Sequence, residues 1–128
     1  MAEPDVLLAD MVGSERTELA GMTVDVGGAG DARVRRIVYP PGFRWSVDIR
    51  PVVGGEVCMH AHVGFLARGR LAGRYEDGCE FDYQAPQVVA IEPGHDAWAG
   101  EAEPAVLIEL DFERETVARL GMAARHAH

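Results

Sequence analysis

Side chains that bind metals are concentrated in residues 55–62, which read Gly-Glu-Val-Cys-Met-His-Ala-His. In an extended strand, side chains two residues apart point to the same face. Glu56, Cys58, His60 and His62 would then share one face, and the residues between them are apolar. Burying such groups without partners costs about 2 kcal/mol or more for each of them. A bound metal removes that cost, because imidazole and thiolate are ligands of zinc, iron, nickel and copper.

A further candidate ligand lies in residues 91–98, where His95 directly follows Pro93-Gly94. A histidine after a tight turn, between two strands, can face the same interior as the first stretch. The residues therefore predict a metal site of His60, His62 and His95, with Cys58 as an additional ligand. Two alternatives stay open: an edge strand whose histidines face water, and a metal-free barrel whose histidines are hydrogen-bonded.

Two carboxylates are candidates for catalysis beside this site. Glu56 and Asp96 could move a proton to or from a metal-bound substrate. Asp96 could instead orient His95 from behind, or pair with an arginine. A serine triad is not predicted, because Ser14 and Ser46 are the only serines in the chain.

The elements that would position these residues are mostly strands. Glycine and proline interrupt the chain at short intervals, which is typical of a sandwich or barrel of short strands. Apolar and polar residues alternate in the first predicted strand, and Asp-Gly is a favoured hairpin turn in the next pair. We expect strands over residues 43–50, 71–76, 79–83 and 88–91, and helices over residues 113–125 and 4–11.

Length and charge restrict the class of protein. A chain of 128 residues with 48% hydrophobic residues forms one domain with one core. The net charge of −9 argues against a nucleic-acid partner. An anionic substrate would need local arginines, for which Arg68, Arg70 and Arg74 are candidates. With no secretory signal and no apolar run of roughly 20 residues, the sequence predicts a cytoplasmic protein that has no membrane partner and keeps its thiols reduced.

The motifs His60-Ala61-His62 and Pro93-Gly94-His95 resemble those of the cupins, in particular short single-domain bacterial cupins. The resemblance extends over about residues 22–112. It implies an all-β, cupin-type jelly-roll β-barrel with a metal inside and a homodimeric assembly. The chain would then consist of an N-terminal arm or short helix (residues 1–21), the barrel (22–112), and a short C-terminal helix and tail (113–128).

The match to the cupin motifs leaves two registers open. In the first, His60 and His62 are the family's His-x-His pair, and Leu66 occupies the position of the metal-binding glutamate. In the second, His62 takes the glutamate position, and Cys58 and Glu56 replace the two histidines. The second motif is also looser than usual, because Ala85 or Pro86 replaces a glycine and no asparagine follows Trp98. A three-histidine site, or a mixed histidine and cysteine site, fits these residues better than the standard one.

The resemblance implies one divalent transition metal and a small-molecule ligand or substrate inside the barrel. Zinc is the first choice, because it accepts histidine with thiolate, and Fe(II) or nickel is the alternative. The predicted function is a metal-dependent enzyme of the dioxygenase, isomerase or lyase type. The alternative is a non-catalytic cupin that binds a small molecule or senses a metal. Cys79 is expected to be incidental, and His126 and His128 are expected to lie in a frayed tail. The residues predicted to line the pocket are Trp45, Phe65, Tyr75 and Trp98.

Overall fold

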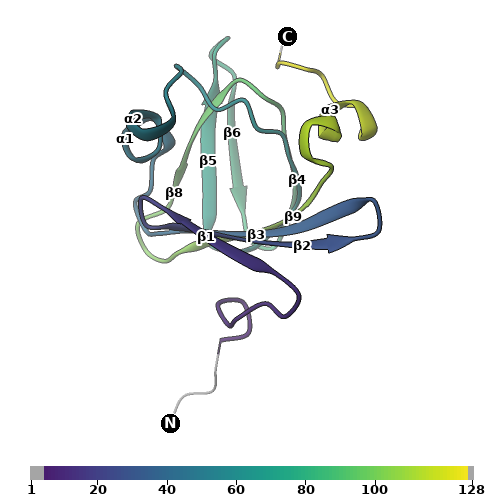
Figure 1. The fold of residues 1–128 in the computed structure, drawn as a ribbon. Coiled ribbons are helices and arrows are strands. Elements are labelled where there is room, and N and C mark those ends of the chain that lie inside the picture. Colours follow the sequence, from purple (N-terminus) through teal and green to yellow (C-terminus); the bar gives the residue numbers. More distant parts are fainter. Residues whose placement is uncertain (1–4, 127–128) are drawn as a thin grey trace.

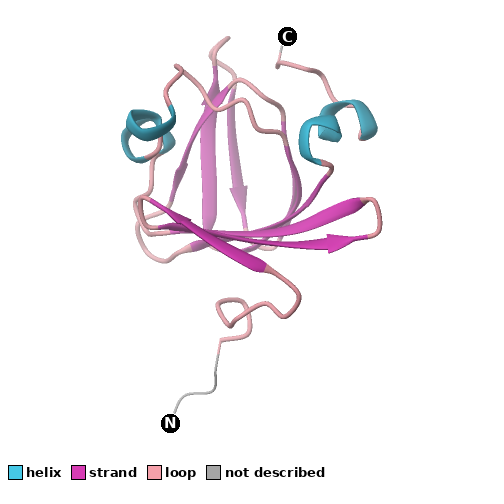
Figure 2. Ribbon diagram, viewed as in Figure 1, coloured by secondary structure: helices cyan, strands magenta, loops and turns pink. Residues whose placement is uncertain are grey.

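The computed structural model describes residues 5–126. Two sheets face each other, with short helices at the sides (Figures 1 and 2). The larger sheet has the strand order β1-β2-β3-β9-β4-β7, and the smaller has the order β6-β5-β8. The strands are β1 (Glu15–Leu19), β2 (Met22–Ala29), β3 (Ala32–Tyr39), β4 (His62–Arg68), β5 (Arg70–Tyr75), β6 (Glu80–Gln84), β7 (Gln87–Ile91), β8 (His95–Ala99) and β9 (Ala105–Asp111). The helices are α1 (Trp45–Asp48), α2 (Arg50–Val53), the 3-10 helix η1 (Glu113–Glu115) and α3 (Thr116–Arg119).

The predicted hairpin and the strand after it are confirmed. β5 pairs antiparallel with β6, with Arg74 opposite Glu80, and the loop between them contains Asp77 and Gly78. Gly78 has a φ of 93°, which a residue with a side chain rarely adopts. β7 covers the predicted strand over residues 88–91 and pairs with β4. This pairing sets His62 opposite Ile91 and so brings together the two stretches that contain the candidate metal ligands.

The strand predicted over residues 43–50 is wrong, because this segment forms α1 and the start of α2. Trp45 and Ile49, four residues apart, are buried on the same side, whereas Val47 is 64% exposed. The backbone N–H of Arg44 donates to the Asp48 carboxylate at 2.8 Å and supports the first turn. The buried residues therefore recur at every fourth position, as in a helix, and not at every second position, as in a strand.

The chain before β4 is irregular and is not the strand expected over residues 55–62. Only Cys58 pairs there, in an isolated antiparallel bridge with His95. The Cys58 N–H donates to the His95 carbonyl at 2.7 Å, and the His95 N–H donates to the Cys58 carbonyl at 3.1 Å. Glu56 consequently does not share the predicted strand face with Cys58 and is exposed to solvent.

The core lies between the two sheets. Leu66, Leu71 and Leu107 are almost fully buried there, and Val89 and Ile91 from β7 are completely buried. Leu66, the residue at the glutamate position of the first cupin register, is thus a core residue. Packing of these apolar side chains holds the sheets against each other and supplies the main stabilisation.

A second buried group lies on the larger sheet, away from the cavity. Asp25 on β2 is directly opposite Arg16 on β1 and Arg36 on β3. The Asp25 carboxylate accepts from Arg16 at 2.8 Å and from Arg36 at 2.9 Å. The Asp25 and Arg36 side chains are only 3% and 4% exposed. The two guanidinium groups hold the pKa of Asp25 below its usual value, although burial alone would raise it.

The two end segments are less helical than predicted. The described residues before β1 form turns and no helix, and β1 lies within the predicted arm, residues 1–21. The helix predicted over residues 113–125 is limited to η1 and α3, because Leu120 and Gly121 end it. None of the helices in residues 5–126 is long and apolar enough to cross a membrane.

Candidate metal centre

Three buried side chains meet at the inner end of the cavity. Cys58, His62 and His95 each offer a ligand atom, and these atoms lie within 4.8 Å of one another. The side chains come from the loop before β4, the first residue of β4 and the first residue of β8. The imidazole rings of His62 and His95 have their centroids 5.4 Å apart in an edge-on arrangement. The strand pairings described above create this cluster from residues 37 positions apart.

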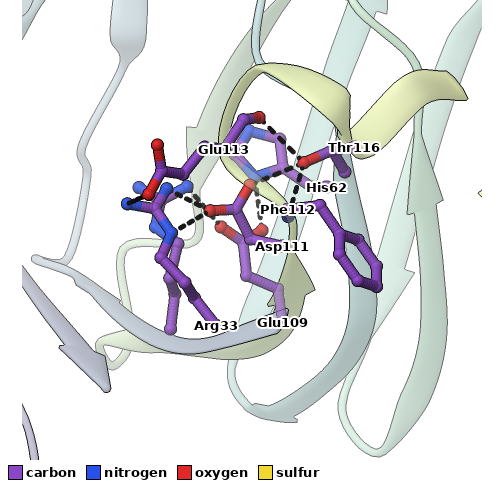
Figure 3. A network of polar contacts seen from close by, with 8 residues as sticks. Arg33, His62, Glu109, Asp111, Phe112, Glu113 and Thr116 are labelled. Atoms are coloured by element: carbon purple, nitrogen blue, oxygen red, sulfur yellow. Dashed lines mark hydrogen bonds and ion pairs between the residues drawn. The ribbon is translucent and has the colours of Figure 1, made fainter. Parts of the chain in front are cut away.

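Glu109 on β9 orients His62. The Nδ1 atom of His62 donates to the Glu109 carboxylate at 2.7 Å, and Figure 3 shows the two side chains approaching from neighbouring strands. Arg35 on β3 lies 2.8 Å from the other Glu109 oxygen and balances its charge. Because Nδ1 carries the proton, Nε2 of His62 is left to face Cys58. A carboxylate behind a histidine is the usual arrangement around protein-bound metals.

A backbone carbonyl orients His95 in the same manner. Nδ1 of His95 donates to the Glu92 carbonyl oxygen at 2.8 Å, so that Nε2 is again left for the cluster. His95 is only 1% exposed. Both rings are therefore oriented with Nε2 towards the cluster, each by a partner outside it.

The charges within the cluster favour a thiolate. Burial alone would raise the pKa of Cys58, but the hydrogen bonds and charges of His62 and His95 outweigh it and lower that pKa to about 5. Burial would likewise lower the pKa of His62, but Glu109 and Cys58 raise it to about 10. At neutral pH the metal-free site therefore holds a thiolate beside an imidazolium. Thiolate is the form of cysteine that binds metals.

The cluster opens onto a cavity of about 720 Å³ between the sheets. Its walls are mostly apolar, and His60 lies on them, with its ring centroid 6.1 Å from that of His62. Unlike the three clustered ligands, His60 is exposed to solvent. The structure thus brings together three of the four predicted metal ligands and leaves His60 at the mouth.

The two predicted catalytic carboxylates lie away from the cavity. Glu56 is exposed and does not contribute to the wall. Asp96 follows His95 but points elsewhere, where its carboxylate accepts from the Ser46 hydroxyl at 2.8 Å and the Ser46 N–H at 3.0 Å. Arg44 also donates to it at 3.3 Å. Of the alternatives for Asp96, the structure has the arginine pairing.

Of the four predicted pocket residues, the described cavity wall includes Trp45 alone. Phe65 is 46% exposed on the opposite face of β4. Tyr75 is buried beside His95, with ring centroids 6.2 Å apart, and donates no atom to the wall. Trp98 packs under the guanidinium group of Arg44 at 4.5 Å.

The positive charges at the cavity come from β3. Arg33 and Arg35 line the wall, whereas Arg68, Arg70 and Arg74 form ion pairs elsewhere. Arg33 pairs with Asp111, whose other oxygen accepts from the Thr116 hydroxyl at 2.7 Å (Figure 3). Sequence reasoning missed Glu109 and both arginines. The available signal was a lone glutamate inside the apolar strand Ala105–Asp111, beside the basic run Arg33-Val34-Arg35-Arg36.

Comparison with solved structures identifies the fold. A cupin 2 conserved barrel domain protein from Salinispora arenicola CNS-205 aligns over 81% of this chain and 88% of its own, with a TM-score of 0.52 and 15% identity. A cupin-2 domain protein from Rhodospirillum rubrum aligns over 94% of this chain and 89% of its own, with a TM-score of 0.55 and 16% identity. No protein-family model and no curated protein matches the sequence. At these identities the likeness concerns the fold alone: the chain has the cupin fold, mostly β, with open sheets and a short C-terminal helix.

The donor set fits a divalent transition metal. Thiolate and imidazole nitrogen are both ligands of zinc, and catalytic zinc sites commonly have three protein ligands and one open position. The cluster has two preoriented nitrogens and one sulfur around a common point, and the cavity adjoins it. The chemistry of these ligand atoms therefore suits a bound divalent metal.

Proposed function

We propose that the chain is a metal-binding cupin domain that acts on a small molecule in its cavity as a metal-dependent enzyme. Cys58, His62 and His95 would hold one divalent ion, zinc in the first place and Fe(II) or nickel as the alternative. The observation that carries this proposal is the position of three buried donors within 4.8 Å of one another at a cavity of about 720 Å³. A bound ion there would supply a Lewis acid that polarises a carbonyl group or a water molecule.

The chain's own residues have separate roles in this proposal. Glu109 and the Glu92 carbonyl hold the protons at Nδ1 of His62 and His95, so that Nε2 of each ring stays available. The apolar wall excludes water and binds the body of the ligand. Arg35 and Arg33 lie on one side of the wall, where guanidinium N–H groups beyond those paired with Glu109 and Asp111 could donate to a carboxylate or another oxygen anion of a ligand.

His60 distinguishes catalysis from simple binding. If His60 stays at the mouth, the ion keeps an open position for a substrate, as catalytic sites do. If His60 turns inward as a fourth ligand, the site is closed and suits metal sensing. The second candidate function is therefore a non-catalytic, metal-sensing or small-molecule-binding cupin. The specific support for it is that the described cavity wall contains no aspartate or glutamate that could carry a proton. Catalysis by Glu56 or Asp96 stays a prediction. It would require one of these carboxylates to move into the cavity.

The resemblance to short bacterial cupins also supports a homodimer, for which light scattering provides the test. A cytoplasmic location agrees with the free thiol of the buried Cys58.

Elemental analysis of the purified full-length chain tests the function. We expect the transition-metal content to be about one equivalent lower in His62→Ala than in wild type and to be unchanged in Asp96→Asn. Oxygen uptake and turnover of small carboxylates would then be screened for wild type and both variants. Activity that needs the metal supports the enzyme, and stoichiometric metal without turnover supports the sensor. A wild type that takes up no zinc, iron or nickel at this position contradicts both the metal-dependent enzyme and the metal sensor, and leaves the small-molecule-binding cupin.

A further inference from the structure

We propose that a second divalent metal ion binds outside the barrel, at Asp77, Cys79 and His126. One ligand atom from each residue lies within 4.8 Å of the other two. Asp77 and Cys79 come from the loop between β5 and β6, and His126 from the segment that follows α3. Carboxylate, thiolate and imidazole are the three ligand types that zinc accepts in proteins. The segment expected to be frayed is thus part of a site at His126, while His128 lies outside the described residues.

The imidazole of His126 is oriented in the way that metal-bound histidines are. Its Nδ1 atom donates to the Glu92 carboxylate at 2.8 Å, and its Nε2 atom faces the Asp77 carboxylate at 3.4 Å. Glu92 therefore fixes the tautomer that leaves Nε2 directed at Asp77 and Cys79. A carboxylate on one nitrogen and a metal on the other is the usual pattern.

Further contacts hold the His126 ring before any ion binds. Its ring stacks on Tyr75, with centroids 3.8 Å apart and planes inclined by 15°. The His126 N–H donates to the Pro93 carbonyl at 3.1 Å, and the preceding Arg125 pairs with Glu76. Ligands that are already fixed lose little freedom when the ion binds.

The loop presents its two ligands in a fixed arrangement as well. One oxygen of Asp77 accepts from the Cys79 N–H at 2.9 Å, which leaves the other oxygen facing His126. The carboxylate and a thiolate would together neutralise a divalent ion. Glu92 adds negative charge nearby, and the whole chain carries a net charge of −9, so the surroundings favour a cation.

A metal here would fasten the segment after α3 to the rim of the barrel. Glu92 connects the two sites, because its side chain holds His126 and its carbonyl holds Nδ1 of His95. The exterior ion would thus steady the turn from which His95 enters the cavity. The exterior site is partly exposed, so water would complete the coordination of the ion.

Zinc binding by reciprocal variants of the full-length chain tests this site separately from the interior one. Equilibrium dialysis against zinc would count the equivalents bound by Cys79→Ser and His126→Ala. Cys58→Ser and His62→Ala are the matched controls, and circular dichroism checks that each variant is folded. We expect the exterior equivalent to be absent from the first pair and present in the second. Glu92→Gln should weaken exterior binding about 10–100-fold.

Proteolysis gives a readout that depends on the segment itself. Trypsin cuts after Arg125, next to the proposed ligand, and zinc should slow this cut in wild type and in Cys58→Ser but not in Cys79→Ser. The proposal is overturned if Cys79→Ser and His126→Ala bind as much zinc as wild type, or if zinc leaves the cut unchanged in wild type. If only the Cys79→Ser and His126→Ala variants lose zinc, the result supports the exterior site and contradicts the interior one.

Discussion

Two regions of this barrel that hold buried charges are built differently. On the larger sheet, the Asp25 carboxylate is enclosed by Arg16 and Arg36, and both of its oxygens accept hydrogen bonds from them. In the interior, Cys58 and His62 interact with each other, but their cluster borders an open cavity of about 720 Å³. The Asp25 carboxylate has its counter-charges within the chain, whereas the cavity beside the interior cluster has room for a bound ion.

This difference separates a structural group from a candidate functional one. Cross-strand pairing alone produces the Asp25 group, because its three residues are direct neighbours on β1, β2 and β3. The interior cluster needs strands from both sheets, and it directs nitrogen and sulfur to one point. A buried charge that is fully paired stabilises the fold at most, whereas ligands that converge beside a cavity are suited to an ion.

The largest expected effect comes from breaking the structural group. Asp25→Asn leaves Arg36 buried without a counter-charge and should lower the free energy of unfolding by about 3 kcal/mol. Urea denaturation measures this, and zinc binding by the folded variant should equal that of wild type. A loss of zinc together with unchanged stability would reverse the assignment of the two regions.

A smaller effect is expected from the carboxylate behind the metal centre. Glu109→Gln removes the charge that holds the proton on Nδ1 of His62, so zinc affinity should fall about 10–100-fold. Asp96→Asn is the matched control, because Asp96 binds Ser46 and Arg44 instead of the cluster. Competition with a chelator gives both affinities. Equal affinities for the two variants would show that Glu109 does not position His62.

The pH dependence of the metal-free chain should separate the regions further. The Cys58 contribution is lost as the pH falls through about 5, and the His62 contribution is lost as it rises through about 10. In the unfolded chain the pKa is about 8.5 for cysteine and about 6.5 for histidine. The two gradients cancel between those values, so the difference in unfolding free energy between the metal-free wild type and a Cys58→Ser/His62→Ala double variant should be constant there and shrink on either side.

The Asp25 group should behave differently under the same titration. The pKa of Asp25 is lowered, so its contribution is present above about pH 4 and is lost only as the pH falls through the lower folded value. The deficit of Asp25→Asn should therefore be constant from about pH 5 to pH 9 in urea denaturation. A deficit that changes between pH 6 and 9 would mean that Asp25 is linked to another titrating group.

The smallest effect is expected at an exposed pair. Arg70 and Asp82 form a two-point ion pair across β5 and β6, but both side chains are about half exposed. Asp82→Asn should change the free energy of unfolding by at most about 1 kcal/mol. A cost equal to that of Asp25→Asn would mean that burial does not distinguish these pairs.

Much of the fold could be predicted from local patterns. The Asp77-Gly78 hairpin, the β7 strand and the cupin fold followed from turn residues, alternation and two short motifs. Residues 43–50 were misassigned, because phenylalanine, tryptophan, valine and isoleucine at alternate positions read as a strand. Burial of Trp45 and Ile49 against the core, with Val47 left outside, overrides that pattern.

The site could be predicted only in part, because its neighbours lie far along the chain. His62 and His95 were found from residue type and spacing. Glu109 is 47 positions from His62 and reaches it through the β4–β9 pairing. Glu56 was expected beside them only because residues 55–62 were taken as one strand, and that strand does not form.

Anomalous diffraction at the zinc edge, from crystals of the Cys79→Ser variant grown with zinc, tests the central claim most directly. We expect one strong peak between the Cys58 sulfur and the Nε2 atoms of His62 and His95, and no peak there when the same crystals carry His62→Ala as well. A cavity without a peak, in crystals where zinc binds elsewhere on the chain, would contradict the interior metal centre and the function built on it.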